Sequence, residues 1–230
     1  MKLQALDGRL LTAAGFVRQG AVFADIGTDH AHLPIFLLES GRIARAFCSD
    51  INEGPLDSAK RNAREAGVED LITFKLTDGA SGLSGFGITD YAICGMGGEL
   101  IASIIEASEH LRSIGVRLIL QPMTKPAELR RALAKLGFSV IGEEYSCDSD
   151  KRYLCICAEY IGSPYEISPI EAEIGKDFVK NDNNSSQILY YEAKKRAVLR
   201  RIEGKSLGGE SSVFDRELLA AIEKRLSLLT

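Results

Sequence analysis

Residues 21–34 read AVFADIGTDHAHLP. An apolar run at 21–24 ends in an acid, Asp25, and Gly27 follows two residues later. Such a run is typical of a buried parallel strand, and a glycine after it lets a ligand approach the backbone closely. The stretch therefore predicts a strand that leads into a ligand-binding loop, followed by a helix that Pro34 opens.

Strands and helices alternate along the rest of this part of the chain. A short amphipathic helix that carries Arg9 is expected before the first strand. Further strands are expected at residues 44–50, 72–76, 90–94 and 116–121, and helices at residues 52–67, 99–107 and from 124 onward. This order predicts an α/β fold with a mostly parallel, Rossmann-like sheet, which binds its ligands at the carboxyl ends of the strands.

The sheet is expected to end in a hairpin. Residues 138–145 and 153–160 both have strand character, and a polar turn at 147–150 joins them without a helix. They should therefore pair in antiparallel fashion. A doubly wound sheet that finishes in this way resembles the class I methyltransferase arrangement more than the dehydrogenase one.

The segment from Gly162 to Pro164 predicts a domain boundary, because strand patterns cease there and helical periodicity follows. We expect residues 1–162 to form the α/β domain and residues 163–230 a small coiled-coil domain of two antiparallel helices. The first of these helices carries a basic cluster, which is either a solvated face or an RNA contact surface: Lys194, Lys195, Arg196, Arg200, Arg201 and Lys205. The apolar stripes could also form a dimer seam, so a monomer or a weak dimer is expected.

Composition limits the class of protein. A hydrophobic content of 45% and a charged content of 26% indicate a globular chain. No apolar run approaches the ~20 residues of a membrane span, and the start lacks the order of a secretion signal, so a cytoplasmic protein without membrane contact is expected. The net charge of −4 means that any contact with nucleic acid must be local. The five cysteines lack metal-ligand spacing, so no metal is expected.

Acids stand at the ends of the first three predicted strands: Asp25, Asp50, and Asp78 followed by Gly79. A Gly-x-Gly-x-x-Gly fingerprint is absent, which disfavours a dinucleotide-dependent oxidoreductase. S-adenosylmethionine has no phosphate and needs acids for its ammonium group and ribose hydroxyls. We expect Asp50 to accept hydrogen bonds from the ribose hydroxyls and Asp78 to accept one from the adenine amino group. Asp25 is expected to hold the methionine end through water or the backbone. The site is completed by Gly27, Thr28, Ile51, Gly79, Gly95 and Met96. The alternative is that these acids cap strand ends and helix starts.

A glycine-rich turn, Gly95-Met-Gly-Gly98, follows the strand at 90–94. Methyltransferases place the group to be methylated at this position of the sheet, and glycines there leave room for a planar base. The Asn/Asp-Pro-Pro-aromatic loop of enzymes that methylate exocyclic amino groups is absent, so a ring nitrogen is favoured. A tight turn into the next helix is the alternative interpretation.

Several motifs together resemble the bacterial tRNA (adenine(22)-N1)-methyltransferases, and they span nearly the whole chain. They are the Leu-x-x-Arg-Leu type element at 6–10, the loop at 25–34, Thr77-Asp78-Gly79, Gly95-Met-Gly-Gly98, Leu120-Gln-Pro122 and the helical tail. In this family a tyrosine is expected at the position that His32 occupies in this chain. The resemblance implies transfer of a methyl group from S-adenosylmethionine to N1 of adenine 22, with tRNA held in part by the tail.

Asp29 is the predicted catalytic residue. It lies two residues past Gly27, where it could accept a hydrogen bond from the adenine amino group and offset the positive charge that forms on the base. Its alternative role is to cap the helix at Pro34. Residues expected to contact substrate or RNA are Arg9, His30, Gly97, Gln121, Lys125, Lys194, Lys195, Arg200 and Arg201.

Two other functions stay open from the sequence. A methyltransferase for a small molecule or a protein would keep the fold but would not need the basic tail. A non-catalytic RNA-binding module would not need to bind S-adenosylmethionine.

Overall fold

One seven-stranded sheet forms the centre of the protein, whose computed structural model describes residues 5–176 and 184–229. The strand order is β3-β2-β1-β4-β5-β7-β6. The strands are β1 (Phe23–Ile26), β2 (Ala46–Asp50), β3 (Ile72–Leu76), β4 (Asp90–Gly97), β5 (Arg117–Thr124), β6 (Phe138–Asp148) and β7 (Lys151–Tyr160). The first five pair in parallel, and β7 is antiparallel to both of its neighbours. The predicted Rossmann-like fold and its closing hairpin are therefore confirmed.

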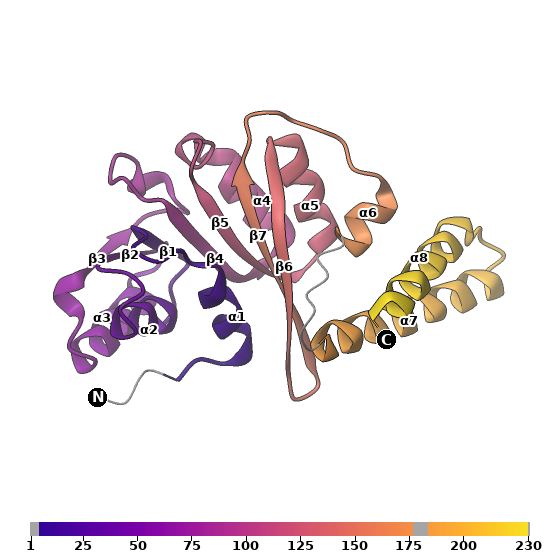
Figure 1. Cartoon of the computed structure of the whole chain (residues 1–230), viewed down its shortest axis with the longest axis horizontal. Helices are drawn as coiled ribbons and strands as arrows, with labels where there is room; N and C mark the ends of the chain where they lie inside the picture. Colours follow the sequence, from indigo (N-terminus) through magenta and orange to yellow (C-terminus); the bar gives the residue numbers. More distant parts are fainter. Residues whose placement is uncertain (1–4, 177–183, 230) are drawn as a thin grey trace.

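Helices cover both faces of this sheet (Figure 1). One face packs against α1 (Gly8–Phe16), α2 (His32–Glu39) and α3 (Glu53–Glu65), and the other against α4 (Gly98–Ala107) and α5 (Pro126–Lys135). Three single turns of 3-10 helix, Glu69–Leu71, Ser81–Leu83 and Glu109–Leu111, lie in the connections. None of the helices in the described ranges is long and apolar enough to cross a membrane.

The strands β4 and β5 each run three residues further than the sequence predicts. Gly97 pairs with Thr124 at the far end, and the register shifts beside Gly95, whose φ of +80° lies in the left-handed region. Both strands thereby extend toward the carboxyl edge of the sheet. The register shift between Cys94 and Met96 is a β-bulge, and a bulge changes the direction of the neighbouring side chains.

Beyond the sheet lie α6 (Pro169–Ile174) and two long antiparallel helices, α7 (Ser185–Leu207) and α8 (Val213–Leu229). The two long helices are as expected, and their shared core includes Tyr191, Val198, Leu218 and Ile222. The short α6 is not predicted. Ser168 and Glu171 form a capping box at its start, where Pro169 is the first helical residue. Residues 1–4, 177–183 and 230 of the two predicted domains lie outside the described residues.

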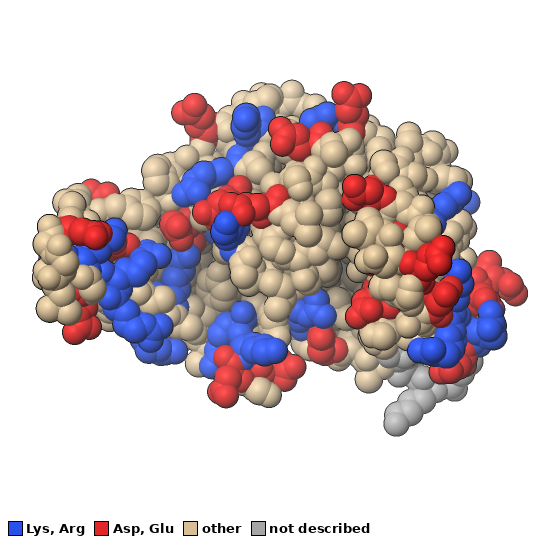
Figure 2. All heavy atoms as spheres, turned by 180° about the vertical axis from the view of Figure 1, so that it is seen from behind, with Lys and Arg blue, Asp and Glu red and all other residues tan. Residues whose placement is uncertain are grey.

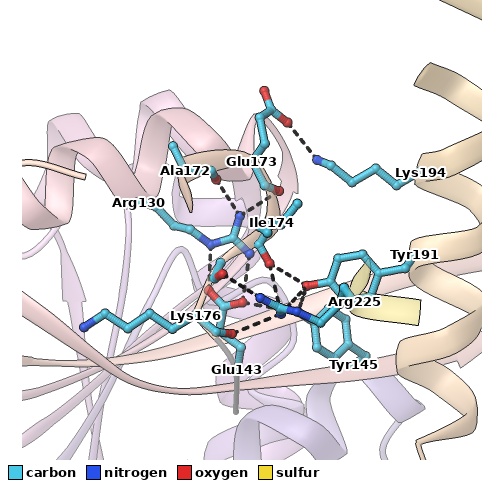
Figure 3. Close-up of polar contacts among 11 residues, drawn as sticks. Arg130, Glu143, Tyr145, Ala172, Glu173, Ile174, Lys176, Tyr191, Lys194 and Arg225 are labelled. Carbon is cyan, nitrogen blue, oxygen red and sulfur yellow. Dashed lines mark hydrogen bonds and ion pairs between the residues drawn. The ribbon is translucent and has the colours of Figure 1, made fainter. Parts of the chain in front are cut away.

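A buried polar network fastens these helices to the α/β domain (Figure 3). Arg130 of α5 forms a two-pronged ion pair with Glu143 of β6 (2.6 and 2.9 Å), and it also donates to the carbonyl of Ala172 in α6 (2.8 Å). Arg225 of α8 donates to the hydroxyl of Tyr191 (3.1 Å) and to the backbone that follows α6. Because Arg130 and Glu143 are both buried, the network fixes α6 against the sheet.

Candidate active site

Two adjoining cavities open at the carboxyl edge of the parallel strands. The larger, of about 560 Å³, lies beside the ends of β1 and β4, and the smaller, of about 100 Å³, lies toward β2 and α4. Gly27, Asp50 and Met96 line both. Gly27 has a φ of +73°, in the left-handed region that favours glycine. The methyl end of the flexible Met96 side chain lies where a Cβ at position 27 would stand, so the backbone conformation, more than this movable contact, explains the glycine at this turn.

Asp25 is a buried acid in the wall of the larger cavity. The Thr28 hydroxyl donates to its carboxylate (2.6 Å), and the N–H groups of Gly27 and Thr28 both donate to the carbonyl of Ser49. Burial raises the pKa of Asp25 to about 6, although the hydrogen bond from Thr28 and the charge of Arg9 oppose this. Thr28 itself is buried, so it orients Asp25 rather than facing the cavity.

The smaller cavity is mostly apolar and carries the acids of the next two strand ends. Asp50 ends β2 and accepts the N–H of Asn52 (2.9 Å), while Asp78 lines the cavity beside Ile51 and Gly79. Gly79 has a φ of +55° and lies close to Ile104 of α4. This combination of an apolar slot with two carboxylates at its ends suits a nucleoside, which has a flat base and ribose hydroxyls.

Asp29 lies at the mouth of the larger cavity, and 74% of its side chain is exposed. His30 Nε2 is 3.2 Å from its carboxylate, and the rings of His30 and His32 are 5.3 Å apart. Burial lowers the pKa of His32. Asn62 of α3 donates to the carbonyl of His30 (2.9 Å) and so ties the loop to the neighbouring helix. The predicted catalytic acid therefore faces the cavity and is oriented by a neighbour.

Arg9 and Gln121 meet under the glycine-rich turn. The buried Gln121 amide oxygen accepts from the Arg9 guanidinium (3.0 Å) and from the N–H of Gly95 (3.1 Å). Arg9 lines the larger cavity, as expected of a residue that contacts a ligand. The complete burial of Gln121 argues against the predicted direct contact with RNA, and its side chain instead fixes Arg9 and the turn.

The three glycines of the turn have different surroundings. Gly95 lines the cavity, but a Cβ at Gly97 would be 3.2 Å from the Thr124 hydroxyl, and one at Gly98 would be 2.2 Å from the carbonyl oxygen of Lys125. Two of the three therefore serve close packing against the β5–α5 connection, as in the alternative interpretation of a tight turn. Lys125 pairs with Glu99 of α4, away from the residues that line the cavities.

Most cations of the α7 cluster are ion-paired within the helical part of the chain. Figure 2 shows Lys and Arg side chains gathered on these helices with Asp and Glu among them. The pairs are Lys194 with Glu173, Lys195 with Glu223, and both Arg201 and Lys205 with Asp215. Arg196 and Arg200 are exposed, and neither forms an ion pair with another described residue. The pairing argues against the predicted RNA contact for Lys194, Lys195 and Arg201 and leaves it open for Arg200.

Tyr153 is a lining residue of the larger cavity that the sequence analysis did not select. It follows the hairpin turn, and Met123 of β5 also lines this cavity. Strand alternation places Tyr153 on the same face of β7 as the buried Cys155, which predicts a core position and does not indicate a cavity. Among the described residues, no group of three or more His, Cys, Asp or Glu side chains is arranged to hold a metal ion.

The comparisons with known proteins agree with this geometry. Residues 6–156 match the family model described as "Methyltransferase domain". A curated relative, the tRNA (adenine(22)-N(1))-methyltransferase of Bacillus subtilis (strain 168), is 36% identical over 154 residues. The match covers 67% of this chain, and the chain spans 65% of that relative's length.

Two solved structures match over nearly the whole chain. The Bacillus subtilis m1A22 tRNA methyltransferase superposes with a TM-score of 0.78 at 28% identity, covering 98% of this chain and 97% of that one. A Streptococcus pneumoniae protein proposed to be a tRNA (m1A22) methyltransferase, solved in complex with S-adenosyl-L-methionine, gives a TM-score of 0.81 at 29% identity and covers 96% of this chain and 100% of that one. The chain therefore belongs to the methyltransferase domain family, and within that family it is similar to the bacterial tRNA (adenine(22)-N(1))-methyltransferases in sequence and in structure.

Proposed function

We propose that the protein transfers a methyl group from S-adenosylmethionine to N1 of an adenine in tRNA, the adenine at position 22. The observation that carries the proposal is one continuous set of cavities in which Asp25, Asp50 and Asp78 follow one another and Asp29 stands at the mouth. The named activity of the curated relative supports the choice of tRNA as substrate.

The residues around the cavities fit S-adenosylmethionine. Asp25 would face its ammonium group, Asp50 its ribose hydroxyls, and Asp78 its adenine amino group in the apolar slot between Ile51 and α4. Bound there, the donor supplies a methyl group on a positively charged sulfur. The carboxylates of the site are negatively charged and accept hydrogen bonds. They would lie opposite the positively charged ammonium group and the hydrogen-bonding hydroxyl and amino groups of S-adenosylmethionine.

Methylation of adenine N1 does not require a strong general base. Adenine N1 has a free lone pair at neutral pH, so it can form the new N–C bond directly while the electron pair of the breaking C–S bond stays on sulfur. The base then carries a positive charge. Asp29, held by His30, would accept a hydrogen bond from the adenine amino group and stabilise that charge as it develops, which makes orientation and electrostatics the main contributions of the protein.

Access to N1 requires an unpaired base. Because N1 is buried in a base pair, the target adenine must leave its stack, at a cost of a few kcal/mol that contacts elsewhere on the tRNA offset. Arg196 and Arg200 on α7 are candidates for those contacts. We further propose that residues 163–230 act as a coiled-coil tRNA-binding domain, residues 1–162 as the catalytic domain, and the whole as a cytoplasmic monomer or weak dimer.

The test is transfer of a labelled methyl group to unmodified bacterial tRNA, followed by mapping of the modified base. Asp29→Ala should lower the rate of transfer by roughly 100-fold or more, because it removes the acceptor for the developing charge, while binding of S-adenosylhomocysteine stays within about threefold of wild type. Asp57→Ala is the matched control, since this acid is exposed on α3 and pairs with Lys60 away from the cavities. Label at a base position other than adenine N1 would contradict the assigned chemistry.

A methyltransferase for a small molecule or a protein is the second candidate. The internal pairing of Lys194, Lys195 and Arg201 is the observation that favours it, because it removes much of the basic surface expected for RNA. Tight binding of S-adenosylhomocysteine without transfer to any tRNA would favour this candidate.

A further inference from the structure

The tip of the β6–β7 hairpin projects beyond the rest of the sheet. β5 pairs with β7 at residues 156–159, whereas the rungs from Glu144↔Cys155 to Asp148↔Lys151 join β6 to β7 alone within the described sheet. The tip extends from the carboxyl edge of the parallel strands, between α1 and the start of α7 (Figure 1). It therefore stands beside the mouth of the larger cavity.

The two faces of this tip contact different parts of the protein. On one face Ser146 lies against the start of α1, and its cross-strand partner Tyr153 lines the cavity. On the other face the Tyr145 hydroxyl is 2.9 Å from that of Tyr191, and Cys147 Sγ is 3.9 Å from a backbone carbonyl of α7. The hairpin thus separates the cavity from the helical part and touches both.

Tyr153 is the one Phe, Tyr or Trp among the described residues that line this cavity. Its side chain is half-buried, and its hydroxyl forms no hydrogen bond with another described residue. The polar groups of the fold therefore do not account for a tyrosine here. Asp29 and the exposed Met123 line the same cavity, so a base that enters this cavity to reach Asp29 shares it with the ring.

Charge at the tip is balanced, which decides what kind of contact it can make. Lys151 and Arg152 stand beside Asp148 and Asp150, and Arg152 donates to the carbonyls of Ser149 and Lys151 in the turn itself. Attraction of phosphates is therefore not the strongest feature of the tip. An aromatic ring can bind any base through its face, independently of charge.

We propose that Tyr153 is a substrate-positioning residue: the target adenine, once out of its stack, packs against the Tyr153 ring and is thereby held with N1 toward the donor and its amino group toward Asp29. The inference rests on the proposed function and extends it to a residue outside the donor site. It also gives the projecting hairpin a role. The ring is carried by β7, and the helical part contacts the other face of the hairpin through the hydroxyls of Tyr191 and Tyr145.

Tyr153→Ala should lower kcat/KM for tRNA roughly 10- to 100-fold, since stacking on an aromatic side chain contributes on that scale. Tyr153→Trp and Tyr153→Phe should stay within about threefold of wild type because they keep a ring, and binding of S-adenosylhomocysteine should stay within about twofold in all three. With 2-aminopurine at the target position, the fluorescence of the bound tRNA should be quenched by wild type and recover in Tyr153→Ala. A purely structural role of the tyrosine would not produce this signal.

Phe86→Ala is the matched control, because this partly exposed ring stacks on Phe47 before the start of β4, at the opposite edge of the sheet. Transfer by Tyr153→Ala at the wild-type rate would overturn the inference. So would a parallel loss of S-adenosylhomocysteine binding, which would make Tyr153 part of the donor site. Absence of transfer by the wild-type protein would be the failure of the proposed function, and this inference would fall with it.

Discussion

The acids at the strand ends beside the cavities and the cations of α7 are both charge clusters, but only in α7 are most of the charges paired within the protein. Asp25, Asp50 and Asp78 form no ion pair with a Lys or Arg among the described residues. The Asp25 carboxylate accepts from a hydroxyl and the Asp50 carboxylate from a backbone N–H. In α7 four cations have carboxylate partners on α6 or α8.

This difference distinguishes charges that are left for a ligand from charges that the fold uses. An acid kept without a counterion beside a cavity raises the free energy of the empty protein, so a ligand that brings positive charge or donors is the expected compensation. A lysine that is paired within the helical part contributes to its assembly and has less to offer an RNA phosphate. Substitutions at paired and unpaired charges should therefore change different properties.

The largest effect is expected where a paired charge is also buried. Arg130→Ala would leave the Glu143 carboxylate buried without its partner and should lower the free energy of unfolding by roughly 3–5 kcal/mol. It should also loosen α6, whose Ala172 carbonyl accepts from Arg130. Urea denaturation followed by circular dichroism measures the change.

The neighbouring Arg131 is the control for this substitution. It is exposed and lies 3.8 Å from Glu128, so Arg131→Ala should change the free energy of unfolding by about 0.5 kcal/mol or less. Replacing the buried pair together, as Arg130→Met with Glu143→Leu, should recover much of the lost stability because no unpaired charge remains. Equal losses for Arg130→Ala and Arg131→Ala would contradict the role of the network.

An opposite and smaller change is expected at an unpaired acid. Burial raises the Asp25 pKa from 3.8 to about 6, so the ionised carboxylate destabilises the empty folded protein by roughly 2–3 kcal/mol above pH 6. Asp25→Asn should therefore stabilise the donor-free protein at pH 8 and abolish tight donor binding. The gain should vanish below about pH 4, where Asp25 is protonated in both the folded and the unfolded chain. Thermal unfolding at the two pH values measures it.

The wild-type protein gives the complementary measurement. Protonated Asp25 has no charge to offer an ammonium group, so donor affinity should weaken roughly tenfold between pH 8 and pH 5. Other titratable groups also line the cavity. The pH profile of Asp25→Asn separates their contribution from that of Asp25: if its residual binding keeps the full pH dependence, those groups and not Asp25 are responsible.

The sequence predicts the sheet well because each strand carries its own signal. The apolar run before Asp25, the caps and the turn glycines are local features, and they place the strands, their mostly parallel pairing and the closing hairpin correctly. The hairpin tip and α6 show where local signals end. Residues 147–150 are polar and resemble a loop, yet cross-strand pairing extends β6 and β7 to Asp148 and Lys151. The six residues of α6 are too few for helical periodicity to register.

The candidate site divides in the same way. Asp25, Gly27, Asp50 and Asp78 could be predicted because they follow strands whose ends must meet at one edge. The burial of Gln121, the packing of Gly97 and the pairing of Lys194 could not, because their partners come from elements distant in the sequence. Tyr153 was missed for a related reason: an aromatic residue in a strand is usually a core residue, and the projecting hairpin is what brings it to the cavity.

The smallest effect is expected for neighbouring cations of α7, of which some are ion-paired and others are not. Arg196 is exposed and has no ion-pair partner among the described residues, while its neighbour Lys195 is 2.9 Å from Glu223. Arg196→Ala combined with Arg200→Ala should weaken tRNA binding about fivefold at moderate salt and reduce the slope of log Kd against log salt by about one to two, because up to two phosphate contacts are lost. The melting temperature should stay unchanged. Lys195→Ala should leave tRNA binding within about twofold, since its charge is already used by α8. If Lys195→Ala weakens tRNA binding as much as the double substitution does, ion pairing on α7 does not withhold a cation from RNA, and the distinction between the two clusters fails for exposed charges.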